Sequence, residues 1–252
     1  MRLFRTLMAA LFIGAAAQVA AQVNTEAMRK SEIEDGFYTR LVYNFQISKG
    51  NFDYWEHRPE FRVDHKNGSW HSFFIINLTR ADKFGERFIN QGVAHLRIVK
   101  KITRMLSMEV FGQYDWNDFI LMDNRYLTGG GLRLRLLHYP DKFDMYIASG
   151  AMGEWEYYLN NIEPAKKLLR STSYVTLKYM LSETVRFDYT QYFQFDTQRI
   201  TDYRTIIDAS LTFMVNKVLS FQTVLNYRFD NEPVPTIKDY DITIRNGLVL
   251  SI

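Results

Sequence analysis

The 252-residue chain has no cysteine, only five prolines and, after residue 22, no long apolar run. Without cysteine there can be no disulfide and no lipid attached to a cysteine near the N-terminus. A membrane-spanning helix needs about 20 mostly apolar residues, so residues 23–252 contain no candidate for one. Strands that alternate between polar and apolar residues can also cross a membrane, and their average hydropathy stays low.

Residues 1–21 have the pattern of a secretory signal peptide. Two arginines precede an apolar stretch, Leu7–Ala17, and small residues follow at Val19-Ala20-Ala21. This stretch is too short for a membrane anchor, which needs about 20 residues. We therefore predict cleavage after residue 21, followed by a polar tail over 22–35.

The charge balance argues against a nucleic-acid partner. Removing the two signal arginines leaves 29 of the 31 basic residues, against 28 acidic ones. A nearly neutral chain offers no general basic surface for a phosphate backbone.

Residues 36–252 are dominated by alternation with a period of two. In 219–229, Leu219, Phe221, Leu225, Tyr227 and Phe229 occupy one face and polar residues occupy the other. This pattern is typical of strands with one apolar and one polar face. It predicts about twelve strands, over 36–48, 53–65, 69–80, 89–101, 104–116, 126–138, 143–154, 171–182, 184–196, 202–215, 217–229 and 239–252.

The connections favour an antiparallel up-and-down transmembrane β-barrel. Tight turns, such as the one at Lys66-Asn67-Gly68, alternate with connections that we expect to be long and polar. The long ones are "RADKFGERF", "DWNDFILMDNR", "EWEYYLNNIEPAKKLLR" within the predicted loop 153–170, "FDTQRITDY" and "DNEPVPTIKDY". Long loops on one side and short turns on the other describe an outer-membrane barrel.

A soluble antiparallel sandwich is the structural alternative, because it would show the same period. The predicted strands are longer than the usual length of about 5–6 residues and match the 9–11 needed to cross a bilayer. Aromatic residues also gather near the strand ends on the long-loop side, as in an interfacial girdle. They are Trp55, Trp116, Tyr126, Tyr203, Tyr227 and Tyr240. We therefore favour the barrel.

The C-terminal strand resembles a closing strand of such a barrel. Tyr240, Ile242, Ile244, Leu248, Leu250 and Ile252 would face lipid, with Asn246 interrupting the series. Arg245, Gly247, Leu250 and Ile252 fit the signal read by barrel-assembly machinery, although Ile252 stands where bacterial barrels usually carry Phe.

Three segments carry a resemblance that the general features of a β-barrel do not explain. "NQGVAHLRIVKKITRMLSMEVFGQYDWNDF" (90–119) and "RYLTGGGLRLRLL" (125–137), with the ending "NYRFDNEPVPTIKDYDITIRNGLVLSI" (226–252), resemble the family of salt-induced outer-membrane proteins, bacterial β-barrel domains of unknown function. The resemblance implies an outer-membrane barrel over residues 36–252 and brings no catalytic motif.

Charged residues should point away from lipid, because an exposed Lys or Arg at mid-membrane costs about 2–4 kcal/mol. This rule selects fifteen residues to line the lumen: Arg40, Arg58, Arg62, His95, Arg97, Glu109, Arg133, Arg135, Lys178, Arg186, Asp188, Arg204, Asp208, Arg228 and Arg245. Twelve of them are Arg, Lys or His, which predicts a basic lumen that favours anions. Alternatively, these residues pair with carboxylates and only hold the wall together.

No convincing catalytic, metal or cofactor site is visible. His71 and Ser72 are neighbours on a strand and should point to opposite faces, so they cannot act as a Ser–His pair. The acidic loop Asp115–Asn124 lacks the glycine and terminal glutamate of an EF-hand loop. The run "TGGGL" (128–132) precedes a strand and not a helix, which favours a strand bend over a phosphate loop.

The sequence therefore predicts an outer-membrane β-barrel that acts as a small-solute pore and not as an enzyme. Its expected partners are outer-membrane lipid, the barrel-assembly machinery and small, anionic solutes, with no nucleic acid and no cofactor. Two alternatives stay open: an outer-membrane enzyme or lipid-processing barrel, and a closed structural or adhesive barrel.

Overall fold

A computed structural model describes residues 34–50, 53–216 and 219–250, which form a single antiparallel sheet of twelve strands. The strands are β1 (Gly36–Ser48), β2 (Tyr54–Asn67), β3 (Trp70–Lys83), β4 (Glu86–Lys101), β5 (Leu106–Asn117), β6 (Met122–Tyr139), β7 (Phe143–Tyr158), β8 (Lys166–Ser182), β9 (Val185–Asp196), β10 (Tyr203–Met214), β11 (Leu219–Asp230) and β12 (Tyr240–Leu250). Two 3₁₀ turns, Asp118–Ile120 and Leu159–Asn161, join β5 to β6 and β7 to β8. Within the described residues, no helix is long and apolar enough to cross a membrane. The predicted signal peptide (1–21) lies outside these residues, as does most of the tail.

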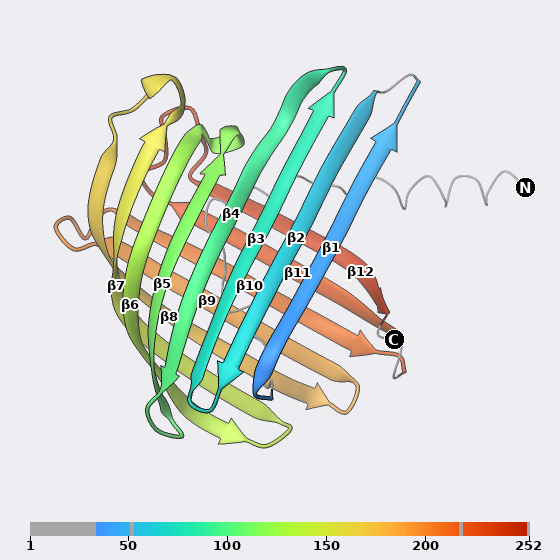
Figure 1. Ribbon diagram of the computed structural model, residues 1–252, viewed down its shortest axis with the longest axis vertical. Coiled ribbons are helices and arrows are strands. Elements are labelled where there is room, and N and C mark those ends of the chain that lie inside the picture. The colour runs from blue at the N-terminus through green and yellow to red at the C-terminus, as the bar shows by residue number, and fades with distance from the viewer. Residues whose placement is uncertain (1–33, 51–52, 217–218, 251–252) are drawn as a thin grey trace, which may run out of the picture.

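Every strand pairs with its neighbours in the chain, so the order is β1 to β12 without a crossover. This confirms the predicted twelve-stranded, up-and-down antiparallel arrangement. The sheet curls until its two edges, β1 (blue) and β12 (red), come round to the same side of the molecule (Figure 1). Among the described residues, β1 pairs only with β2 and β12 only with β11, so the curl stops short of hydrogen-bonded closure.

The curled sheet has a polar concave face and an apolar convex face. In β4, the buried residues Gln91, His95 and Arg97 alternate with the exposed Leu96 and Ile98. Over the described residues, 24 polar or charged side chains are buried, compared with 13 apolar ones. The interior is therefore predominantly polar, the reverse of a soluble core.

The convex face exposes large apolar side chains in many strands. Leu41 on β1 is 70% exposed and Leu248 on β12 is 71% exposed. Contiguous apolar surface of this extent is rare on soluble monomers. The alternative of a soluble sandwich, which would bury these side chains, is therefore wrong.

The two ends of the sheet carry different connections. The loop end has the connections after β1, β3, β5, β7, β9 and β11, and the turn end has the others. At the turn end, β2 and β3 meet at Asn67-Gly68, where Gly68 has a positive φ of 54°, as the Asn-Gly signal predicted.

Three of the predicted long connections are wrong. In "DWNDFILMDNR", only residues 118–121 lie outside β5 and β6. "RADKFGERF" is mostly strand, because β3 and β4 continue to a two-residue turn, Phe84-Gly85. The segment 153–170 is also mostly strand, since β7 runs to Tyr158 and β8 begins at Lys166. The reason is that alternation continues through Glu154 to Tyr157, with carboxylates facing inward and aromatic rings facing outward. The connection after β11, residues 231–239, is long as predicted.

The glycines of "TGGGL" lie in β6, where the strand runs unusually close to β7. A Cβ on Gly131 would come 2.5 Å from the carbonyl oxygen of Ser149, and a Cβ on Gly150 would come 2.2 Å from that of Gly130. Only glycine fits so close an approach. These residues therefore allow a strand bend, as expected, and no helix follows them.

Aromatic residues line the convex face near the loop end. Tyr126 packs against Tyr114 at a ring distance of 5.0 Å and against Tyr157 at 6.4 Å. Tyr203 lies between Phe193, at 5.8 Å, and Phe229, at 5.7 Å. Amphipathic rings in such a position are typical of a membrane–water interface.

Candidate functional site

The strand register places all fifteen residues selected from the sequence on the concave face. The cross-strand neighbours Arg40, Arg62, Ile75, His95 and Gln113 show how one row runs through five strands. Since side chains two residues apart share a face, the remaining selected residues follow from the same register.

Many of these residues form ion pairs, so their charge is partly balanced. The pairs are Arg58–Glu56, Arg62–Asp64 at 2.5 Å, Arg97–Glu109 at 2.9 Å, Arg135–Asp144 at 2.7 Å, Arg186–Asp188 at 2.8 Å and Arg228–Asp208 at 2.8 Å. Arg40 makes no ion pair with any residue in the described ranges. Arg245 donates a hydrogen bond to the amide oxygen of Asn226. Three of these carboxylates, Glu109, Asp188 and Asp208, are themselves among the selected residues. The other three, Glu56, Asp64 and Asp144, were not identified from the sequence.

The largest group of charges lies at the loop end and was mostly missed from the sequence. We call it the loop-end network: Asp115, Arg125, Glu154, Glu156, Arg170, Asp202, Arg204 and Asp230. Five carboxylates and three arginines share this space, and all but Asp230 are buried. The inward positions of Glu154 and Glu156 could have been found by extending the alternation of β7 through "EWEYY".

Arg204 on β10 connects the parts of this network. Its guanidinium contacts Glu154 at 2.9 Å and Glu156 at 3.0 Å, both on β7, and its Nε contacts Asp230 on β11 at 2.6 Å. Two strands, β8 and β9, separate β10 from β7 in the sheet. The contact therefore spans the concavity and does not run along its wall.

Two further arginines complete the loop-end network. Arg170, with a fully buried side chain, contacts Glu154 at 3.0 Å and Asp202 at 2.8 Å. Arg125 contacts Asp115 at 2.5 Å. Each carboxylate in these pairs is held by a charge-assisted hydrogen bond, which fixes geometry more strongly than a neutral one. The network therefore ties β5, β6, β7, β8, β10 and β11 together at this end.

The connection 231–239 folds over the loop-end network. Val234 at its centre is only 7% exposed. Glu232 pairs with Arg199 of the β9–β10 connection, and its carbonyl oxygen accepts a hydrogen bond from Lys166 Nζ at 3.3 Å. The hydrogen bond with Glu232 raises the pKa of the Arg199 guanidinium. A cavity of about 660 Å³, open to solvent, lies between this connection and the network.

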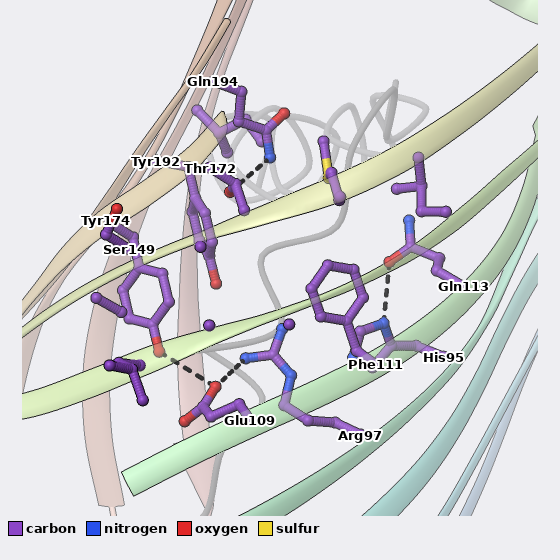
Figure 2. Close-up of a pocket in the computed structure, with 18 residues that line it drawn as sticks. His95, Arg97, Glu109, Phe111, Gln113, Ser149, Thr172, Tyr174, Tyr192 and Gln194 are labelled. Carbon is purple, nitrogen blue, oxygen red and sulfur yellow. Dashed lines mark hydrogen bonds and ion pairs between the residues drawn. The ribbon is translucent and has the colours of Figure 1, made fainter. Parts of the chain in front are cut away.

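A second cavity lies deeper on the concave face, between β4–β7 and β8–β10 (Figure 2). Its space of about 620 Å³ includes volume that is open to solvent. We call it the central pocket.

One wall of the central pocket is polar. Glu109 accepts hydrogen bonds from Arg97 at 2.9 Å and from the Tyr174 hydroxyl at 3.4 Å, so it joins β4 and β8 (Figure 2). His95 Nδ1 lies 3.0 Å from the amide oxygen of Gln113. Hydrogen-bonding side chains from three strands therefore converge on one space.

Rings and small residues form the rest of the pocket. Phe111 projects between the polar groups (Figure 2), with the Arg97 guanidinium 5.3 Å from its ring. Tyr174 and Tyr192 have ring centres 4.9 Å apart. Gly131 and Gly150 also line the pocket and contribute no side chains to it. The rings and the glycines come from different strands, and only the curl of the sheet brings them together into one site.

Two further sequence motifs, His71-Ser72 and the acidic segment near Asn117, have hydrogen-bond partners in the structure. His71 lies on the concave face, where its Nε2 is 3.0 Å from Asp64, whereas Ser72 belongs to the opposite face, as expected. In the acidic segment after β5, Asn117 accepts a hydrogen bond from the Phe119 backbone at 3.0 Å.

Arg245 and Gly247 of the predicted assembly signal lie on the concave face of β12. The backbone of Leu250 belongs to that strand, and its side chain and Ile252 lie outside the described residues. The predicted lipid-facing residues Ile242, Ile244 and Leu248 are exposed. Asn246, which interrupts the series, accepts a hydrogen bond from Thr223 at 2.8 Å.

Solved structures that are similar to this chain include porins and a channel. The chain is similar to the NanC porin with a TM-score of 0.50 and 9% identity, over 78% of this chain and 94% of that one. Weaker similarities are to the CymD monoaromatic hydrocarbon channel (TM-score 0.43, 9% identity, 87% and 80% of the two chains) and the KdgM porin (0.38, 10%, 86% and 98%). At such identities the similarity to the NanC porin supports a common fold.

No curated protein matches the chain. The family described as "Protein of unknown function, DUF481" matches residues 44–252, which include the end of β1 from residue 44 and all of β2–β12. That description does not include the salt-related name, but it agrees with a family without an assigned activity. The chain belongs to the DUF481 family.

Proposed function

We propose that this protein is an outer-membrane β-barrel that lets small solutes cross, with the concave face as the lining of its pore. The observation that carries the proposal is the distribution of side chains, with charges buried inside the curl and apolar residues exposed outside. In lipid this arrangement is favourable, whereas in water it would expose a large apolar surface. The fold shared with the NanC porin agrees with this function.

In the membrane we infer that β1 and β12 pair and close the barrel. An unpaired strand edge leaves backbone N–H and C=O groups without partners in lipid, at a cost of several kcal/mol for each group. Both edge strands expose apolar side chains outward, including Leu41 and Ile244. Their pairing would therefore continue the apolar convex face around the barrel.

We further propose that the pore prefers anions. This preference rests on the residues selected from the sequence, of which twelve are Arg, Lys or His and three are Asp or Glu, although ion pairs balance many of the arginines. Arg97 and Arg133 both approach Glu109, at 2.9 and 4.0 Å. Arg40 makes no ion pair with any described residue. Fixed positive groups in a narrow channel raise the local concentration of anions.

We infer the route of the chain to the outer membrane from its sequence. Cleavage of residues 1–21 would release it into the periplasm, and the C-terminal strand would be read by the barrel-assembly machinery. The final location is then the outer membrane, with its lipid around the convex face.

A closed structural barrel is the alternative with an observation in its favour. The loop-end network fills part of the concavity, and the connection 231–239 covers that end with Val234 buried. If both stay in place in the membrane, solutes do not pass. The enzyme alternative has no comparable support, because His71 and Ser72, the Ser–His pair considered in the sequence, lie on opposite faces of β3.

A liposome-swelling assay tests the proposal. The refolded mature chain is reconstituted into vesicles, which are then diluted into isosmotic solutions of a small sugar or of an organic anion. Swelling above protein-free vesicles, faster with the anion, supports the proposed pore. No swelling from a chain shown to be folded would favour the closed barrel.

A further inference from the structure

We propose that Leu127, Met152 and Ile206 form an apolar constriction across the concavity, which limits the conductance of the pore and favours solutes that give up water easily. We call these three residues the apolar layer. The proposal rests on the proposed pore, but the facing of the side chains in the layer can be tested without transport. It follows from the register of β6, β7 and β10 and from the positions of the two cavities.

Ile206 on β10 faces Met152 on β7 across the concavity. Two residues before Ile206, the Arg204 guanidinium contacts Glu154 on β7 at 2.9 Å, although β8 and β9 separate the two strands in the sheet. β7 runs towards the loop end and β10 runs away from it. Met152 and Ile206 therefore both lie one inward position beyond this ion pair, on the side of the turn end. The ion pair thus holds their two strands together at the level where these side chains meet.

Leu127 on β6 extends the apolar layer along one wall. Leu127 pairs with Glu154 in the register of β6 and β7, and Gly129 pairs with Met152. Leu127 and Met152 are therefore diagonal neighbours on the concave face, within reach of each other. Leu127 is 5% exposed, and Met152 and Ile206 are each 2% exposed. An almost fully buried apolar level thus interrupts a predominantly polar face.

The apolar layer lies where the two cavities meet. Leu127, Met152 and Ile206 all belong to the lining of the central pocket. Ile206 also lines the cavity at the loop end, beneath the connection 231–239. A solute that moves between the two cavities along the concave face therefore passes Ile206.

An apolar constriction limits passage differently from a charged one. Charged and polar groups can exchange a protein partner for water or for a solute, whereas apolar side chains offer no hydrogen bond in its place. A narrow apolar segment tends to lose its water, and hydrophobic constrictions in channels restrict conduction in this way. Ions and polar solutes must then shed part of their hydration at the apolar layer. Small solutes that hold water weakly should therefore cross most readily.

Two substitutions of Ile206 test the constriction by single-channel conductance of the refolded chain in a planar bilayer. Ile206→Ala removes volume, and Ile206→Thr keeps the branched shape and adds a hydroxyl that holds water. Each should raise the conductance by about twofold or more. Ile207→Ala, the matched control, changes the neighbouring residue on the convex face of β10 and should conduct as the unaltered chain does. If Ile206→Ala does not fold, Ile206→Thr decides, and unchanged conductance in the folded Ile206 variants would overturn the proposal.

The permeability ratio of two halides tests the hydration argument. Iodide holds water more weakly than fluoride and carries the same charge, so the apolar layer should favour iodide. Reversal potentials with iodide on one side of the bilayer and fluoride on the other give the ratio, and Ile206→Thr should lower it. Equal ratios in the unaltered chain and in folded Ile206→Thr would overturn the preference for weakly hydrated solutes.

A cross-link tests the facing of β7 and β10, because the chain has no cysteine of its own. A short thiol-specific cross-linker should join the positions of Met152→Cys and Ile206→Cys in the refolded double variant. The control combines Met152→Cys with Thr212→Cys, which lies on the same face of β10 but about 20 Å further towards the turn end. Absence of a cross-link in the first variant, shown to be folded, would overturn the constriction.

The conductance of folded and inserted chains also separates this proposal from the proposed pore. Steps from the unaltered chain that do not change in the Ile206 variants would reject the constriction and leave the pore intact. Silence of the unaltered chain with steps from Ile206→Ala or Ile206→Thr would reject the open pore and support the constriction. Silence of all of these chains would reject both.

Discussion

Arg204 on β10 donates two hydrogen bonds to the Glu156 carboxylate on β7, from Nη1 to Oε1 at 3.0 Å and from Nη2 to Oε2 at 3.2 Å. This two-point contact crosses the positions of β8 and β9. It makes the loop end a cross-linked structure in which charge holds distant parts of the sheet together.

Replacing Arg204 by methionine should destabilise the protein strongly. The substitution leaves the carboxylates of Glu154 and Glu156 buried with fewer cations, and breaking a buried ion pair in this way costs about 3–5 kcal/mol. The free energy of unfolding should be measured by denaturant titration of the refolded chain in vesicles.

Arg186→Gln is the matched control for this experiment, because the Arg186 side chain is 52% exposed. An exposed pair contributes about 0–1 kcal/mol. Equal losses for Arg204→Met and Arg186→Gln would contradict the role given to the loop-end network.

Neighbouring substitutions on β10 test which face meets lipid. Ala209 lies on the convex face and Ser210 on the concave face, opposite Asp188. Ala209→Arg should cost about 2–4 kcal/mol at mid-membrane, while Ser210→Arg should cost less than about 1 kcal/mol. Unfolding of both variants in the same vesicles gives the comparison, and the reverse order of stability would show that the faces are assigned wrongly.

The glycine pair at the bend should be sensitive to a single methyl group. A Cβ on Gly150 would lie 2.2 Å from the carbonyl oxygen of Gly130, so Gly150→Ala must displace backbone. We expect a loss of about 1–3 kcal/mol, as for overpacked sites. Gly112→Ala is the control, since a Cβ there has nothing within 4 Å. Similar stabilities of the two variants would argue against a close approach of β6 and β7.

The cover over the loop end can be locked because the chain has no cysteine of its own. Arg199→Cys and Glu232→Cys replace an ion pair, and a short thiol-specific cross-linker should join the two positions. If movement of the connection 231–239 admits solutes, cross-linking should lower the single-channel conductance, and the uncross-linked double variant should conduct at least as well as the unaltered chain. Equal conductance with and without the linker would show that this connection does not control entry.

The alternation of residues made most of the fold predictable. The twelve strands, the Asn67-Gly68 turn and the outward positions of Ile242 and Ile244 all follow from local pattern. The register of each hairpin then carries that pattern to the next strand, which is why the inward arginines could be selected from the sequence.

The predictions from sequence failed for residues whose partners are far away in the chain, because the local pattern does not reveal such contacts. Glu154 and Glu156 were assigned to a polar loop, because carboxylates near Asn160 and Pro164 suggest a solvated connection. Their partner Arg204 is 48 residues further along from Glu156, and no local signal links them. The central pocket has the same origin, since Tyr174 on β8 reaches Glu109 on β5 only when the sheet curls.

The most direct test of the pore is the single-channel current of the refolded mature chain in a planar bilayer, with the reversal potential measured under a salt gradient. We expect stable conductance steps and a reversal potential with the sign of anion preference. Steps with cation preference would contradict the basic lining. The absence of steps from a chain shown to be folded and inserted would contradict the open pore.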